Sequence, residues 1–234
     1  MFYPMYMDSS YFSDYFVFIL IPLIISLWAS ASVKSTFNKY SRVSNNHGLT
    51  ASEVARNILR SAGVLDVRIE RVSGNLSDHY DPRTKVVRLS DSVYDSTSVA
   101  AIGVAAHEVG HAIQHATGYV PNKLRSALVP VVNLASSLAV PMLFMGILIG
   151  ATGLSWLGII FFASTVVFSL VTLPVEFNAS GRAIKNLIAY NILSPEENEM
   201  AKKVLNAAAM TYVASALASI GQLLFWISRT RRDD

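Results

Sequence analysis

The chain contains no cysteine and little charge. Only 15% of its 234 residues are Asp, Glu, Lys or Arg, against roughly 25% in an average soluble domain. The absence of cysteine excludes disulfide frameworks, thiolate metal sites, iron–sulfur clusters and cysteine nucleophiles. The net charge is only +3, and the basic residues stand beside apolar segments. This pattern indicates orientation in a membrane and argues against nucleic acid as a partner.

The chain is rich in apolar residues, which make up 52% of the sequence. About 20 apolar helical residues cross the hydrocarbon core of a bilayer, and four stretches approach this length with almost no charge. They are residues 15–33, 127–152, 154–175 and 206–228. Only Gly153 and its neighbours separate the second stretch from the third, so these two should form a hairpin. The sequence therefore predicts a mainly α membrane protein with three to four transmembrane helices, and a lipid bilayer as its partner.

The first and the last stretch each allow an alternative. Residues 15–33 could be a secretory signal peptide, but Asp8 and Asp14 precede them and no Lys or Arg does. Because a signal peptide begins with positive charge, we interpret this stretch as a retained anchor. Residues 206–228 are rich in Ala and Ser, so a helix buried against the others is the alternative to a fourth span.

The distribution of Lys and Arg predicts the orientation. Residues 34–126 contain 12 of the 19 basic residues, and basic loops favour the cytoplasmic side. We therefore expect this region in the cytoplasm and the N-terminus outside. A full span by residues 206–228 would place the arginines that follow it outside, which the same rule disfavours, so the side of the C-terminus stays open.

The water-facing region combines helices with a small sheet. Thr50 and Glu53 have the spacing of a capping box and predict the start of an amphipathic helix. Between residues 67 and 89 apolar residues alternate with polar ones, with turn signals at 74–75 and 81–83. This pattern predicts a small antiparallel sheet of two or three strands.

A further helix of this region carries reactive side chains. It should begin after the N-cap residues at 95–98 and end at Gly118. Residues 99–116 are almost all small or apolar, which indicates a buried helix. Within it, residues 107–111 match the pattern H-E-x-x-H. Because buried histidine and glutamate are costly without partners, a metal site is favoured over two core histidines.

The spacing of this motif suits one zinc ion. His107 and His111 share a helix face about 6 Å apart along the axis, so both imidazoles can reach the same Zn²⁺. Glu108 stands beside the first ligand and is expected to act as general base toward a water that the ion activates.

A catalytic zinc needs a third protein ligand. His115 shares the face of the two histidines but lies about 12 Å from His107 along the helix, so it is expected to play a supporting role. Glu176 is the better candidate, because it follows the third apolar stretch directly. An ionisable residue at a membrane edge is a functional candidate, and the alternative is an interfacial glutamate in water.

Three segments of the chain resemble a known family. They are residues 78–82 (DHYDP), 107–115 (HEVGHAIQH) and 173–183 (LPVEFNASGRA). Together, over nearly the whole chain, they resemble the YugP-type bacterial neutral zinc metallopeptidases. The E-x-x-A part of the last segment is also similar to the HtpX-like membrane endopeptidases.

The resemblance implies a zincin-like core and a gluzincin-type hydrolase in a bacterial cell membrane. It implies that His107, His111 and Glu176 hold the zinc. In the HtpX-like enzymes an Asp that follows the glutamate ligand orients the first histidine. Ser180 occupies this position here, so Ser180 or Asn178 is the expected substitute.

Substrate contacts are less well defined by the sequence. His79, Tyr80 or Arg182 could donate a hydrogen bond to the tetrahedral oxyanion. The strand that ends at residues 78–80, or the one through 86–89, could hold a peptide by backbone pairing. The alternative for His79 and Tyr80 is that they are surface residues beside a turn.

The predicted function is a zinc-dependent membrane endopeptidase acting on polypeptides, membrane proteins included, with its active site facing the cytoplasm. The rival from another class is a noncatalytic membrane scaffold with a structural metal site. A structural zinc normally has four protein ligands and no use for Glu108. A metal transporter would need acids or histidines in residues 127–175, which contain none.

These inferences divide the chain into five parts. The predicted parts are a membrane anchor (1–33), a cytoplasmic zincin-like region with the H-E-x-x-H helix (34–126), a transmembrane hairpin (127–175), a helical region with the third ligand (176–205) and an apolar helix with a basic tail (206–234).

Overall fold

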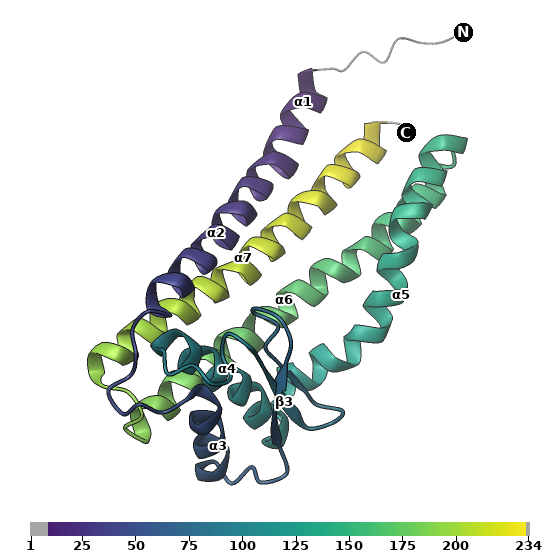
Figure 1. The fold of residues 1–234 in the computed structure, drawn as a ribbon. Coiled ribbons are helices and arrows are strands. Elements are labelled where there is room, and N and C mark those ends of the chain that lie inside the picture. Colours follow the sequence, from purple (N-terminus) through teal and green to yellow (C-terminus); the bar gives the residue numbers. More distant parts are fainter. Residues whose placement is uncertain (1–8, 233–234) are drawn as a thin grey trace. The chain divides into compact units, whose positions relative to one another are not determined.

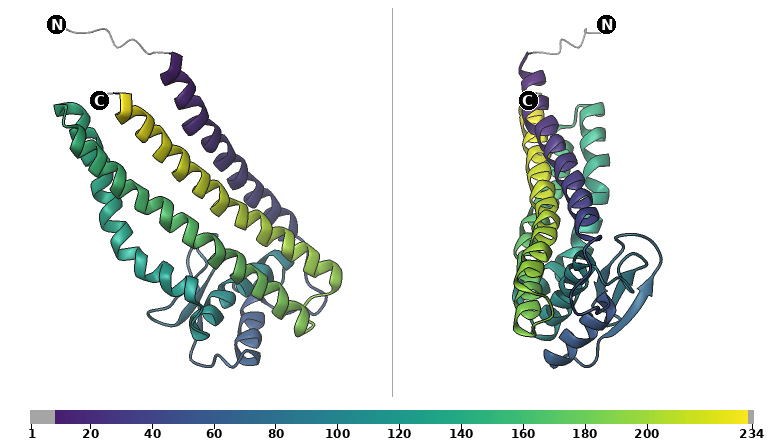
Figure 2. Two further views of the ribbon diagram at one scale, coloured as in Figure 1. Left: turned by 180° about the vertical axis from the view of Figure 1, so that it is seen from behind. Right: turned by 60° about the vertical axis from the view of Figure 1, so that its left-hand side comes forward.

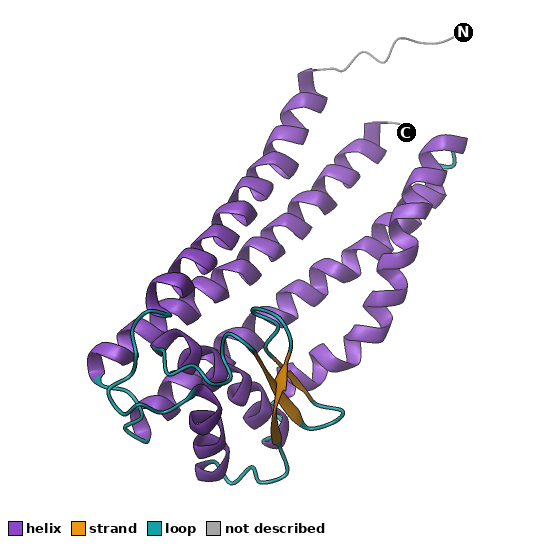
Figure 3. Cartoon of the chain, in the orientation of Figure 1, coloured by secondary structure: helices purple, strands orange, loops and turns teal. Residues whose placement is uncertain are grey.

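A computed structural model describes residues 9–232. Helices make up most of this chain, and the strands are confined to one small sheet (Figure 3), which confirms the predicted mainly α fold. The chain divides into two compact units. The apolar unit comprises the chain up to Ala29, Leu124–Thr172 and the chain from Tyr212, and the mixed unit comprises Ser30–Lys123 and Leu173–Thr211.

Four continuous helical segments are long and apolar enough, by length and composition, to cross a membrane: Phe12–Tyr40, Val120–Ile149, Thr152–Ala189 and Pro195–Arg231. The first segment is built from α1 (Ser9–Tyr15), a short π-helix η1 (Phe16–Leu20) and α2 (Ile21–Tyr40). The others are α5 (Val120–Ile149), α6 (Thr152–Ala189) and α7 (Pro195–Arg232) (Figure 1). The first, third and fourth segments each contain a predicted stretch and continue beyond it, whereas α5 ends at Ile149, three residues before the predicted end at residue 152.

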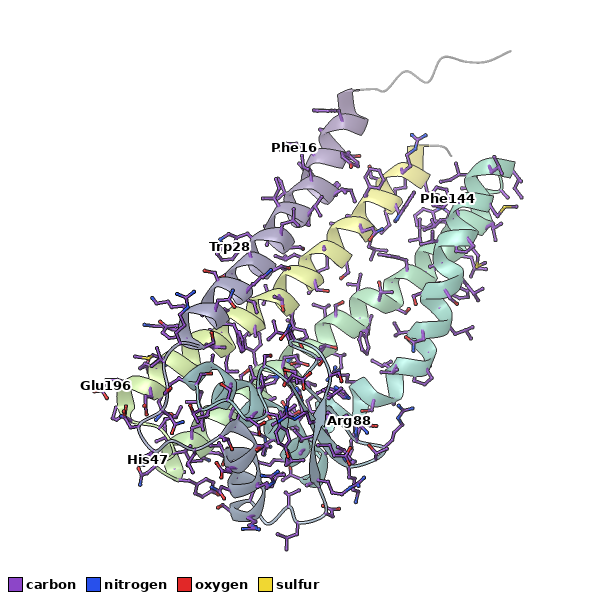
Figure 4. All side chains as sticks on the ribbon, in the orientation of Figure 1. Phe16, Trp28, His47, Arg88, Phe144 and Glu196 are labelled. Carbon is purple, nitrogen blue, oxygen red and sulfur yellow. The ribbon has the colours of Figure 1, made fainter. Side chains whose placement is uncertain are left out.

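Small residues bring helices of the apolar unit close together. A Cβ at Gly221 of α7 would collide with the carbonyl oxygen of Phe18 in η1, and a Cβ at Gly158 of α6 would lie 2.8 Å from the carbonyl oxygen of Ala139 in α5. Large apolar side chains point outward instead: Phe16 is 45% exposed and Trp28 is 59% exposed (Figure 4). Such a surface is typical of helices that face lipid.

The hairpin between α5 and α6 turns earlier than the sequence suggested. The turn consists of Gly150 and Ala151, and Gly150 has a φ of +69°, a left-handed conformation that glycine adopts without strain. Gly153 is already part of α6. Pro130 and Pro141 lie inside α5 without ending it.

The mixed unit contains a three-stranded sheet with the order β1-β3-β2. Its strands are β1 (Arg68–Val72), β2 (His79–Asp81) and β3 (Val86–Ser90). β2 runs antiparallel to β3, but β1 runs parallel to it, so the prediction of an antiparallel sheet was wrong for β1. The most apolar strand, β3, takes the central position, where all of its side chains except that of Arg88 are buried. The segment 73–78 is therefore a crossover and not a hairpin turn.

Two helices of the mixed unit begin as the sequence predicted. α3 (Ala51–Ser61) has its capping box, in which Thr50 Oγ1 accepts a hydrogen bond from the Glu53 backbone N–H and Glu53 accepts one from that of Thr50. α4 (Val99–Ala116) is capped by the Ser98 hydroxyl, which accepts from Ala101 N–H at 3.2 Å. Both helices pack in one hydrophobic core with β3 and parts of α6 and α7. Figure 2 shows the ribbon from two further sides.

Candidate metal centre

Helices α4 and α6 bring three potential metal ligands together. The Nε2 atoms of His107 and His111 lie 3.2 Å apart. Glu176 Oε2 lies 3.3 Å from Nε2 of His107 and 3.4 Å from Nε2 of His111. The Glu176 side chain is only 2% exposed, so a carboxylate from α6 is directed into the buried interface with α4. The three residues predicted as ligands are thus adjacent.

This triangle of donor atoms has the dimensions that zinc requires. A tetrahedral Zn²⁺ with nitrogen and oxygen ligands at 2.0–2.1 Å holds those ligand atoms about 3.3 Å apart. The three observed edges are 3.2, 3.3 and 3.4 Å. The two imidazole planes are nearly perpendicular, at 88°. The donor set therefore fits a zinc ion with three protein ligands and a fourth, open position.

The second nitrogen of His107 contacts α6. His107 Nδ1 lies 3.0 Å from the Ser180 hydroxyl, so Ser180 takes the orienting position that the resemblance assigns to an aspartate. A partner on Nδ1 selects the tautomer that leaves Nε2 available to a metal. Asn178, the other substitute considered, does not contact His107 but accepts a hydrogen bond from Gln114 at 3.0 Å.

The partner of His111 is Gln114, which the sequence analysis did not identify. Gln114 Oε1 lies 3.1 Å from His111 Nδ1, and Gln114 Nε2 donates to the Val175 carbonyl at 2.8 Å. Gln114 is fully buried, and buried amides require such partners. Its position three residues after His111 on a buried helix was the available signal, because residues i and i+3 share a face.

Glu108 lies on α4 next to the ligand pair and is half-buried. Burial raises the pKa of Asp78, and the Glu108 charge adds to this shift, although hydrogen bonds from Ser90 N–H (2.7 Å) and the Ser90 hydroxyl (3.0 Å) oppose it. Burial alone would lower the pKa of His111, but the Glu176 carboxylate and the Glu108 charge outweigh it, so this pKa is raised. The Glu108 charge therefore acts on both Asp78 and His111.

Tyr80 of β2 and His115 of α4 form a pair. The Tyr80 hydroxyl lies 2.7 Å from His115 Nδ1, and the His115 side chain is exposed. His115 is not among the three clustered ligands. Burial and the charges of Asp66 and Asp81 raise the pKa of Tyr80 to about 12, so its phenol stays protonated at neutral pH.

The other two candidate oxyanion donors have partners outside α4. His79 is exposed, and its Nδ1 lies 2.8 Å from the Ser77 carbonyl oxygen. Arg182 Nε donates to Asn178 Oδ1 at 2.8 Å, and its guanidinium lies 5.8 Å from the centroid of the Tyr119 ring. Tyr80 is therefore the one candidate whose described contacts are with α4 itself.

Comparison with known proteins decides the family. Residues 15–231 match the family model described as "Putative neutral zinc metallopeptidase". The chain belongs to this family. It is also 49% identical, over 214 residues, to the "Putative membrane protease YugP" of Bacillus subtilis (strain 168), and this match covers 91% of the chain and 95% of the relative. No solved structure matches the chain.

The descriptions of the family and of the relative agree with features of both units of the structure. The zinc in its description fits the cluster of His107, His111 and Glu176. The membrane in the name of the relative fits the four long apolar helices. The resemblance to the YugP-type metallopeptidases is thus confirmed: the description of the family names a zinc metallopeptidase, and the name of the relative names a membrane protease.

Proposed function

We propose that the chain is a zinc-dependent membrane endopeptidase of the gluzincin type. The observation that carries the proposal is the triangle of His107, His111 and Glu176 donor atoms, with edges of 3.2–3.4 Å. Three protein ligands with a vacant fourth position characterise catalytic zinc sites, whereas structural sites use four. In the described part of the chain the cluster has three members, which argues against the noncatalytic scaffold.

Each step of peptide-bond hydrolysis is assigned to particular residues of the chain. Bound zinc would polarise the scissile carbonyl and acidify the attacking water. Glu108 accepts a proton from that water as the oxygen bonds to the carbonyl carbon. It then passes the proton to the leaving nitrogen as the carbon–nitrogen bond breaks. Tyr80, with its high pKa, is the proposed donor to the oxyanion.

The sheet has two edge strands, β1 and β2, and these are the candidates for pairing with an extended polypeptide substrate. β3 is central and pairs on both sides, so it cannot accept a substrate strand. β2 is an edge strand, and its Tyr80 contacts His115 of α4. Backbone pairing along an exposed edge fixes a peptide independently of its side chains. We therefore assign substrate alignment to β2, with polypeptides, including membrane proteins, as the substrate class.

The decisive experiment compares Glu108→Gln with the wild type. Purified full-length protein in detergent is assayed for zinc content by elemental analysis and for cleavage of casein and of a membrane protein. Glu108→Gln should keep near-stoichiometric zinc and lose several orders of magnitude of cleavage, because it removes the base and no ligand. Glu199→Gln, which changes an exposed glutamate that pairs with Lys202, is the control and should behave as the wild type. Loss of zinc from Glu108→Gln, or full cleavage by it, would overturn the assignment.

We also propose that the active site faces the cytoplasm. The basic residues of the mixed unit support this orientation. A topology reporter placed in the turn at residues 81–83 should score as cytoplasmic, and one beside Gly153 as external. Both reporters on the same side would contradict the hairpin topology.

A further inference from the structure

A cavity of about 540 Å³ lies beside α6 in the mixed unit. The cations Arg182 and Lys185 line it together with the amides of Asn178 and Asn186, and Phe177 and Ile113 supply apolar wall. No carboxylate lines it. Its volume is within the usual range of small-molecule sites. We call this cavity the α6 pocket.

The two cations of the α6 pocket are not neutralised by the protein. Neither Arg182 nor Lys185 forms an ion pair in the part of the chain that the structure describes. Arg182 is instead oriented by its hydrogen bond to Asn178 and by the Tyr119 ring. A concave site with uncompensated positive charge concentrates anions, and a guanidinium beside an ammonium suits phosphate oxygens in particular.

The position of the pocket along α6 indicates which kind of molecule would carry a phosphate group that binds there. The uncharged run 154–175 has 22 residues, about 33 Å of helix, which matches a hydrocarbon core of about 30 Å. Phe177 and Asn178 follow this run directly, and Arg182 and Lys185 follow it by 7 and 10 residues, about 10 and 15 Å of helix, with side chains that lean back toward the N-terminus of α6 and so toward the run. Phe177, at the start of the pocket, is 50% exposed, so an exposed apolar side chain adjoins the cations at this end of the pocket.

We propose that the α6 pocket binds the phosphate group of an anionic membrane lipid. Arg182 and Lys185 pair with the phosphate, and the side chains of Asn178 and Asn186 provide neutral polar wall. Phe177 and Ile113 contact the apolar part of the lipid that adjoins the headgroup. Basic pockets on the cytoplasmic side of membrane helices bind lipid headgroups by this chemistry.

The α6 pocket is connected to a candidate metal ligand by hydrogen bonds. Asn178 Oδ1 accepts from Arg182 Nε at 2.8 Å and from Gln114 Nε2 at 3.0 Å. Gln114 Oε1 in turn lies 3.1 Å from His111 Nδ1. A lipid that orders Arg182 therefore also restricts Gln114 and His111. This second consequence rests on the proposed function, because it requires His111 to hold zinc.

Lipid binding is tested by native mass spectrometry of the full-length protein in detergent. The wild type should retain phosphatidylglycerol in preference to phosphatidylcholine. Lys185→Gln should weaken phosphatidylglycerol binding about fivefold, which is the effect of one lysine at a membrane surface. The control Lys202→Gln removes the same charge from an exposed position outside the pocket and should not change the binding.

Other outcomes overturn the lipid site. Equal retention of the two lipids by the wild type, or unchanged binding by Lys185→Gln, would contradict it. Inorganic phosphate at millimolar concentration should not displace the lipid, because it lacks the apolar contacts. Complete displacement would assign the pocket to free phosphate.

The connection to His111 is tested by zinc loss to a chelator. Phosphatidylglycerol should slow this loss in the wild type and in Lys202→Gln but not in Lys185→Gln. Equal rates with and without the lipid in the wild type would refute the connection and leave the lipid site standing. Absence of bound zinc from every variant would refute the proposed function, while the mass spectra would still decide the lipid site.

Discussion

Gly110 of α4 lies directly against the backbone of Ala179 in α6. A Cβ at Gly110 would stand 2.6 Å from the Ala179 carbonyl oxygen, closer than such atoms can approach, and 3.1 Å from its carbonyl carbon. This contact permits the two helices to approach until Glu176 reaches the histidines. The glycine inside the H-E-x-x-H segment therefore determines the position of a ligand on another helix.

Gly110→Ala should weaken zinc binding by about tenfold or more, because α6 must move and carry Glu176 and Ser180 with it. Gly103→Ala is the matched control on the same helix, since its Cβ would meet Ala201 Cβ at an ordinary 3.5 Å. Both substitutions favour the helix by about 0.5–1 kcal/mol, so propensity does not distinguish them. Competition with a chelator measures the affinities, and equal affinities in the two variants would contradict the role of Gly110.

Substitutions of Glu176 and of His115 are expected to have different effects on zinc binding. Glu176→Gln should lower the affinity by about tenfold or more, because a neutral amide oxygen is a poorer ligand and the site loses a negative charge. His115→Ala should leave the stoichiometry intact, since its described partner is Tyr80. Elemental analysis of the zinc content of both purified variants tests the two expectations. Zinc that survives Glu176→Gln and is lost from His115→Ala would refute the ligand assignment.

The contact between Ser180 and His107 predicts a loss of zinc affinity without the loss of a ligand. Ser180→Ala should reduce zinc affinity by about 10–100-fold, the usual consequence of losing the partner of a ligating histidine. Ser169→Ala removes a hydroxyl from the same helix that bonds only the backbone carbonyl of Thr165, and it should leave the affinity unchanged. A titration with a zinc indicator compares the zinc affinities of the two variants. An equal loss of affinity in both would show that Ser180 acts only on helix stability.

The turn between β2 and β3 should make stability depend on pH. Hydrogen bonds from the Arg83 backbone N–H and the Thr84 hydroxyl, both 2.9 Å, lower the pKa of Asp81 to about 2. A depressed pKa stabilises the folded state above the unfolded value near 3.9, and this contribution disappears as the pH falls toward 2.

Asp81→Asn should therefore unfold at a lower temperature than the wild type at pH 6. The difference should shrink between pH 4 and pH 2. Thermal unfolding is measured with a chelator present, so that loss of metal at low pH does not contribute. A difference that stays constant with pH would contradict the assigned pKa.

Local features of the fold could be predicted because their causes are local. The capping box of Thr50 and Glu53 and the cap at Ser98 depend on residues three positions apart. The orientation of β1 could not be predicted, because it depends on which strand occupies the centre of the sheet. Only the burial of Val86, Val87 and Leu89 places β3 there.

The sequence by itself determined the apolar stretches, from the length of their uncharged runs, although it left the fourth open as a span. It also determined the pair His107 and His111, because helical spacing places them on one face. Glu176 was a candidate from its position and from the family resemblance. Only the tertiary structure decided that Ser180 contacts His107, that Gln114 contacts Asn178, and that Arg182 and Lys185 line a cavity. These contacts join residues 73 and 64 positions apart in the first two cases. Their geometry depends on how closely α4 and α6 pack, which no local pattern specifies.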